Sequence, residues 1–236
     1  MESSMMSPSQ GPEPVNVAAD GDVYLVCGEA AIKTRVSSSI LIRASTEFAA
    51  RLKPHFDEGS VKPDYPVEIP LLADSYHAMR DLCDLLHGNT ITGLSGPKAA
   101  ARIYKLAVVI DKYRCTKILD LQAQGLLLGI RTNMAKVRFL SLSTLSRMTA
   151  AAYLLDQARG FSIATHHMIV GTAELDSGLL KPDYDHIFSF DTILALEEKR
   201  AAAQAKIAHG LPQLGMPVCS YFDDESEASE ASNVTL

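Results

Sequence analysis

The chain has 236 residues and a mass of 25.5 kDa, the size of one large domain or two small ones. Apolar residues make up 47% of the chain and charged residues 21%, which allows a buried core and excludes wholesale disorder and fibrous classes. The net charge of −6 comes from the ends, because residues 1–14 and 208–236 hold seven of the 28 acids and none of the 22 basic residues. The remaining chain has 21 acids against 22 basic residues, and these form no basic stripe, so no nucleic-acid partner is expected.

The sequence predicts an intracellular protein, in the cytoplasm or the nucleus. The first fourteen residues lack the basic and apolar segments of a secretory signal. No uncharged apolar run approaches the ~18 residues of a membrane span, so no membrane partner is expected. The four cysteines form no Cys-x-x-Cys pair, which is typical of reduced thiols. Residues 1–14 and the acidic residues 211–236 have the composition of disordered tails.

A small β-meander is predicted where the ordered chain begins, near Val15. Apolar residues at 15–17 and 23–27 flank Asp20-Gly21, and an Asp-Gly dipeptide between alternating apolar runs favours a tight hairpin. Gly28 permits a second reversal, into a strand over residues 31–36.

Beyond this meander the apolar spacing becomes helical, apart from one further strand over residues 67–70. In the first half of the chain, helices are predicted over 38–44, 45–54, 75–88 and 95–113. Pro54 is expected to end the second of these. Because strands and helices alternate without βαβ regularity, residues 15–120 are predicted to form an α+β domain. The following segments all favour helix and predict a helical extension over 121–210: 121–130, 144–157, 161–171 and 190–209.

Residues in the first half also resemble a BTB/POZ domain of the variety abundant in filamentous fungi. The pattern begins with Asp-Val at 22–23, a Val-Ser-Ser…Leu…Ala-Ser…Phe helix pair and a Pro-His-Phe-x-Glu-Gly turn. It continues with Ile-Pro-Leu at 69–71 and ends on Asp-Lys-Tyr-x-Cys at 111–115. The resemblance implies a small sheet capped by a helical cluster. It also implies a non-enzymatic protein–protein interaction module that often homodimerises and takes no cofactor.

The resemblance marks Phe56, Asp57 and Glu58 as candidate partner-binding residues. Members that recruit a cullin have an apolar-x-Glu element at this place, in which the apolar side chain fills a pocket and the carboxylate fixes orientation. A role as substrate adaptor for a cullin-type ubiquitin ligase is therefore the alternative function. The other interpretation of the same residues is a core phenylalanine followed by a solvated acidic turn.

Asp22, Ser37 and Ser38 form a candidate dimer or structural polar site. Many dimerising BTB domains set a basic residue from the first helix near the aspartate of the first strand, whereas here Asp22 faces a run of serines. We therefore expect Asp22 to accept hydrogen bonds from serine hydroxyls or backbone amides.

No catalytic residue or metal site is predicted. Ser95 and Lys98 have the Ser-x-x-Lys spacing of serine acylases, but both companion motifs are missing, which favours a helix cap. An enzyme that uses Ser95 or a cysteine is the third alternative. Cys83 and His87, at i and i+4, have a spacing that suits two metal ligands, yet Cys83 lies within an apolar helical stripe and is expected to be a core thiol.

Overall fold

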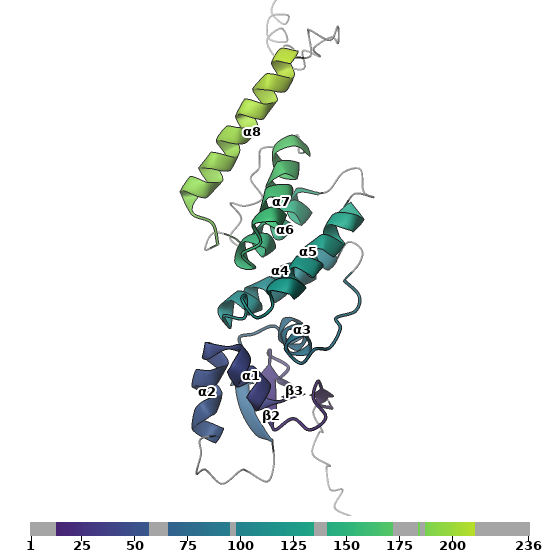
Figure 1. Ribbon diagram of the computed structural model, residues 1–236, viewed down its shortest axis with the longest axis vertical. Coiled ribbons are helices and arrows are strands. Elements are labelled where there is room, and N and C mark those ends of the chain that lie inside the picture. Colours follow the sequence, from purple (N-terminus) through teal and green to yellow (C-terminus); the bar gives the residue numbers. More distant parts are fainter. Residues whose placement is uncertain are drawn as a thin grey trace, which may run out of the picture. The chain divides into compact units, whose positions relative to one another are not determined.

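The computed structural model describes residues 13–56, 66–94, 98–134, 141–171, 184 and 187–210. The two predicted disordered tails fall outside these ranges, apart from the residues next to the fold. The described chain combines a four-stranded sheet with α-helices, which confirms the predicted α+β class (Figure 1). None of the helices in these ranges has the length and apolar character to cross a membrane.

The sheet is formed by β1 (Val15–Asn16), β2 (Val23–Cys27), β3 (Ile32–Val36) and β4 (Val67–Leu71), in the order β1-β3-β2-β4. β2 and β3 pair antiparallel through the reversal predicted at Gly28, which has a φ of 70°. β4 pairs parallel with β2 on its other side.

The hairpin predicted at Asp20-Gly21 is wrong, because β1 pairs parallel with β3 and not with β2. Gly21 instead lies against the end of β3, where a Cβ atom would come within 2.5 Å of the Val36 carbonyl oxygen. Arg35 Nε also donates a hydrogen bond of 2.7 Å to the Gly21 carbonyl. The glycine is therefore required for the close approach of two backbone segments.

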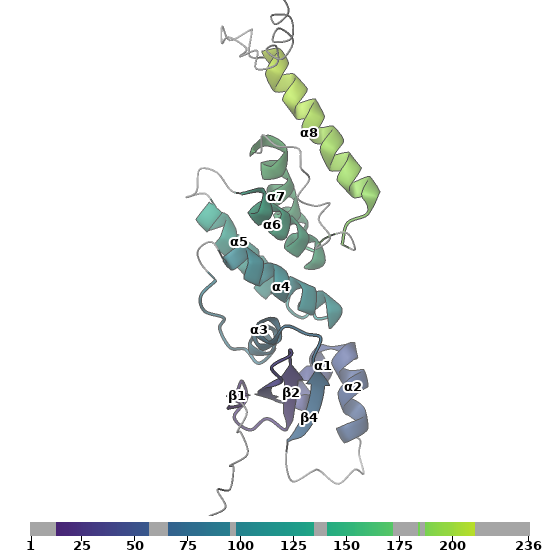
Figure 2. The same ribbon diagram turned by 180° about the vertical axis from the view of Figure 1, so that it is seen from behind.

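Four helices belong to this half of the chain: α1 (Ser38–Ala44), α2 (Thr46–Phe56), α3 (Tyr76–Leu86) and α4 (Ala99–Lys112). α1 packs against α2, and α3 lies between the sheet and α4 (Figures 1 and 2). The predicted stop at Pro54 is wrong, since α2 continues to Phe56. The proline lacks the donor for the bond to residue i−4, and the helix ends only two residues later, so little of α2 depends on the turn that contains it.

Three further helices follow in the same compact unit: α5 (Asp120–Met134), α6 (Leu142–Leu154) and α7 (Ala158–Gly171). One apolar cluster runs from the sheet into these helices, so packing is continuous across residue 120, the predicted end of the α+β domain. The predicted domain boundary at that residue stays a prediction. By its internal packing the chain divides into the compact units Met1–Ser189 and Phe190–Leu236, and α8 (Phe190–Gly210) belongs to the second.

Candidate interaction site around Asp22

Asp22 precedes β2 and acts as the N-terminal cap of α1 from outside that helix. Its Oδ1 accepts a hydrogen bond of 2.7 Å from the Ser38 backbone N–H, and its Oδ2 accepts one of 2.6 Å from the Ser38 hydroxyl. Ser37, the N-cap residue by position, makes no side-chain capping bond. The hydrogen bonds expected from serine hydroxyls and amides are thus present, and both come from Ser38.

Ser37 connects the same helix start to the end of α3. Its backbone N–H donates a hydrogen bond of 3.0 Å to His87 Nε2, and the other ring nitrogen, Nδ1, lies 2.7 Å from the Cys83 carbonyl oxygen. An accepting Nε2 requires the proton to be on Nδ1, so both nitrogens are occupied in the neutral ring. The Cys83 side chain is fully buried, which matches a core thiol rather than a metal ligand.

The other predicted site residues cannot be placed beside this cluster. Asp57, Glu58 and Ser95 lie outside the described residues, and for Phe56 the structure describes the backbone, as the last residue of α2, without the side chain. Both interpretations of Phe56, Asp57 and Glu58 therefore stay predictions.

A second polar cluster joins the Asp-Lys-Tyr-x-Cys segment at 111–115 to α2 and to Asp74. Tyr113 is buried, and its hydroxyl donates a hydrogen bond of 2.7 Å to Asp74 Oδ2, while Lys112 Nζ lies 2.5 Å from Asp74 Oδ1. The Ser45 hydroxyl donates one of 2.6 Å to the Tyr113 carbonyl, and the Phe48 ring stacks on the Tyr113 ring at a centroid distance of 4.3 Å. Burial first, and then the Asp74 contact, raise the pKa of the Tyr113 hydroxyl.

Three buried thiols lie in the same core. Burial raises the pKa of Cys27 to about 12, with a smaller contribution from the Asp74 carboxylate, and burial raises the pKa of Cys115 to about 11. Burial likewise raises the pKa of Cys83 far above its ordinary value. Thiols held in the neutral form are poor nucleophiles, because the thiolate is the reactive species.

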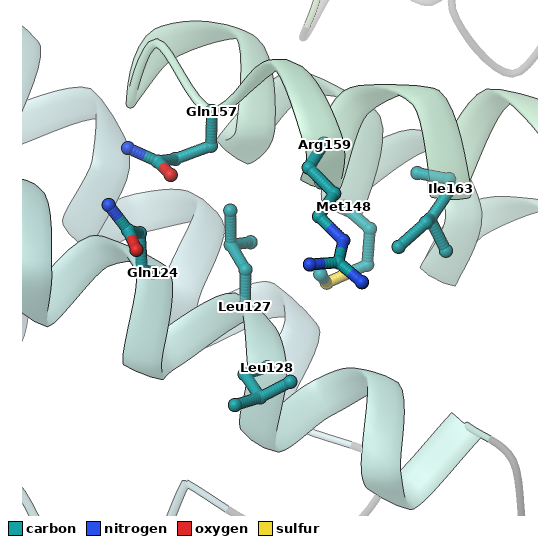
Figure 3. A pocket seen from close by; sticks show the side chains of 9 residues that line it. Gln124, Leu127, Leu128, Met148, Gln157, Arg159 and Ile163 are labelled. Carbon is teal, nitrogen blue, oxygen red and sulfur yellow. The ribbon is translucent and has the colours of Figure 1, made fainter.

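Sequence reasoning missed a pocket of about 400 Å³, which we call the α5–α7 pocket (Figure 3). Its apolar wall is formed by residues of α5, α6 and α7: Leu127, Leu128, Met148, Ile163 and Ala164. Gly160 also lines it, and a Cβ there would lie 2.9 Å from Leu127 Cδ1 and 3.4 Å from Ala152 Cβ. In the sequence Gly160 lies between the predicted helices 144–157 and 161–171, where a glycine indicates a turn and gives no sign of a pocket.

The polar rim of the α5–α7 pocket is formed by two glutamines and an arginine. Asp120 orients both amides, since its Oδ2 accepts a hydrogen bond of 2.9 Å from Gln124 Nε2 and its Oδ1 accepts one of 2.7 Å from Gln157 Nε2. Arg159 extends from α7 toward α5 (Figure 3), and no carboxylate within the described ranges forms an ion pair with it.

A scan against protein-family models finds no match for the chain, and a search of the curated proteins finds no matching relative.

Proposed function

We propose that the chain is a non-enzymatic protein–protein interaction module of BTB/POZ type that self-associates. It acts inside the cell, in the cytoplasm or the nucleus, its partners are proteins, and it needs no cofactor. This proposal rests on the sequence pattern together with the packing of the residues that carry it.

The observation that carries the proposal is the convergence of distant parts of that pattern. Ser45 and Phe48 of the predicted helix pair contact Tyr113 of the Asp-Lys-Tyr-x-Cys segment. Asp22 of the Asp-Val pair binds the first residue of α1. Ser45 and Tyr113 are 68 positions apart and share one buried hydrogen bond, so these parts of the pattern lie in one core, as a single interaction domain requires.

Chemistry of the thiols also favours binding over catalysis. Cys27, Cys83 and Cys115 are buried, and burial raises the pKa of each thiol. A reactive cysteine needs the opposite environment, with the pKa lowered and the sulfur accessible.

We assign the self-association surface to the exposed side of α1. Ile40 is half-buried and lies outside the apolar core cluster, unlike Leu41, which is fully buried. The Asp22–Ser38 hydrogen bonds hold the first turn of this short helix to the residue that precedes β2. A second copy of the chain packed on this side of α1 would remove the part-exposed Ile40 side chain from water, which is favourable for an apolar group.

Co-capture of two differently tagged copies of the purified full chain tests this proposal. We expect the wild-type copies to capture each other and Ile40→Glu to abolish capture. The control is Leu121→Glu, which changes an apolar side chain on α5 that is 77% exposed and should leave capture intact. Absence of capture between wild-type copies at micromolar concentration would overturn the proposal, and equal loss in both variants would remove α1 as the surface.

A further inference from the structure

The α5–α7 pocket has the size and the lining of a small-molecule site. Ligand sites are concave, have volumes of about 300–1,000 Å³ and combine mostly apolar walls with a few polar groups. This pocket has a volume of about 400 Å³, room for roughly a dozen water molecules. It is therefore too small for a bulky dinucleotide. Its apolar wall of leucine, isoleucine, methionine and alanine side chains favours an apolar ligand body.

Charge on the rim determines which kind of apolar molecule fits. The Arg159 guanidinium points from α7 toward α5, across the pocket (Figure 3), and it has no ion pair within the described part of the chain. A guanidinium offers five N–H donors in a planar fork that matches a carboxylate or a sulfonate. An anionic group is therefore the natural partner for this end of the pocket.

The two glutamines add a hydrogen-bonding requirement on the other side. Asp120 accepts a hydrogen bond from the Nε2 of both Gln124 and Gln157, which fixes the orientation of each amide. Gln157 Nε2 also donates a hydrogen bond of 3.2 Å to the Leu155 carbonyl, and Figure 3 shows the carbonyl oxygens of both amides on the side nearer Leu127 and the pocket. These oxygens only accept hydrogen bonds, and they favour a ligand with an O–H or N–H group.

From these contacts we propose that the α5–α7 pocket binds a small amphipathic anion: an apolar body between α5 and α7, an acidic group on Arg159 and a donor facing Gln124 and Gln157. This site is separate from α1 and independent of the proposed self-association, since none of its lining residues belongs to α1.

A matched pair of fluorescent probes tests the proposal on the full chain. 1-Anilinonaphthalene-8-sulfonate has an apolar body, an N–H group and an anion, and N-phenyl-1-naphthylamine is the same skeleton without the sulfonate. We expect one saturable sulfonate site per chain. Arg159→Gln should weaken sulfonate binding at least about fivefold and change binding of the neutral probe less than about twofold.

Two variants act as controls for this experiment. Arg43→Gln removes an exposed arginine on α1 and should leave both probes unaffected. Ile163→Trp fills the pocket and should weaken both probes. Because the chain has no tryptophan, the new indole also reports the pocket by its own fluorescence.

Competition tests the donor requirement, because 6-hydroxy-2-naphthoate and 2-naphthoate differ by one hydroxyl group. The hydroxylated acid should displace the sulfonate probe more strongly. Sulfonate affinity unchanged by Arg159→Gln, non-saturable binding, or binding unaffected by Ile163→Trp would each overturn the proposal. Equal competition by the two acids would overturn its donor component.

Discussion

At the scale of single residues, Tyr113 is a buried side chain whose hydroxyl and ring both have specific partners. Its hydroxyl donates a hydrogen bond to Asp74, whose side chain is only 7% exposed, and its ring stacks on Phe48. Tyr113→Phe keeps the ring and removes the donor, which leaves a nearly buried carboxylate with one partner fewer.

We expect Tyr113→Phe to lower the free energy of unfolding by about 1–3 kcal/mol, the cost of an unsatisfied buried acceptor. Urea titration measures this change. The control is Tyr153→Phe, at a tyrosine that is 51% exposed, where the change should stay within about 0.5 kcal/mol. Equal effects of the two substitutions would contradict a structural role for the Tyr113 hydroxyl.

The buried thiols and Tyr113 predict a loss of stability at alkaline pH. The pKa of Cys27 is raised from 9.0 to about 12 and that of Cys115 from 9.0 to about 11, so above pH 9 the unfolded chain loses protons that the folded chain keeps. The contribution of these groups to the free energy of unfolding should therefore be fully present below pH 8 and be lost as the pH rises from 9 to 11. Urea titrations across this range measure the slope. A flat profile would contradict the buried, neutral thiols, and Cys27→Ala should make the decline shallower.

Two glycines with opposite surroundings give a further prediction. A Cβ at Gly21 would lie 2.5 Å from the Val36 carbonyl oxygen, a backbone atom that cannot move aside, whereas a Cβ at Gly125 in α5 would meet nothing within 4 Å. Gly21→Ala should lower the free energy of unfolding by more than about 2 kcal/mol through overpacking. Gly125→Ala should raise it by about 0.5–1 kcal/mol, because alanine loses less backbone entropy in a helix. Thermal unfolding of both variants measures the contrast, and a shift of the same sign in both would contradict this geometry.

At the scale of elements, an ion pair holds α3 to α4. Arg102 Nε and Nη2 donate hydrogen bonds of 2.7 Å to the two oxygens of Asp81, and the Asp81 side chain is 4% exposed. Removing one partner of a fully buried pair costs ~3–5 kcal/mol, because a buried charge is left uncompensated. The Arg102 side chain is 37% exposed, which moderates that cost.

Arg102→Gln should lower the free energy of unfolding by about 2–3 kcal/mol. The matched control is Arg80→Gln, which breaks the exposed i,i+4 pair with Asp84 at 3.7 Å and should cost less than about 0.5 kcal/mol. Both variants are titrated with urea, because urea is uncharged and does not screen the ion pairs as guanidinium chloride would. A cost for Arg102→Gln no larger than for Arg80→Gln would contradict a role for this pair in joining the helices.

Much of the element order could be predicted from the sequence, because helix periodicity, caps and turn glycines are local signals. The β2–β3 reversal at Gly28 and helices close to the observed ranges follow from such signals. The pairing of β1 was mispredicted since the partner of a strand depends on contacts far along the chain. Asp-Gly favours a hairpin locally, and the close approach of Gly21 to Val36 overrides that preference.

Of the two sites described above, the hydrogen bonds at Asp22 could be predicted from the sequence and the pocket could not. Hydrogen bonds from serine groups to Asp22 could be predicted, because a carboxylate facing a serine run has few other partners. The α5–α7 pocket could not, since it depends on how three helices pack and on which way Arg159 extends. Three of its lining residues, Leu127, Met148 and Ala164, also belong to the apolar core cluster, so no spacing in the sequence separates the pocket from the interior.

For the whole molecule, the distribution of charge is relevant to self-association. With the acidic ends set aside, residues 15–207 have 21 acids and 22 basic residues, so two copies of this part of the chain meet with little net repulsion. The two ends contribute the excess of acids and favour solubility.

The mass of the full chain in solution tests the central claim of self-association most directly. Light scattering at micromolar concentration should give a species of about twice the chain mass of 25.5 kDa, and Ile40→Glu should return it to the single-chain mass. Leu121→Glu should keep the doubled mass. A wild-type chain that scatters only as a 25.5 kDa species across that range would contradict the account.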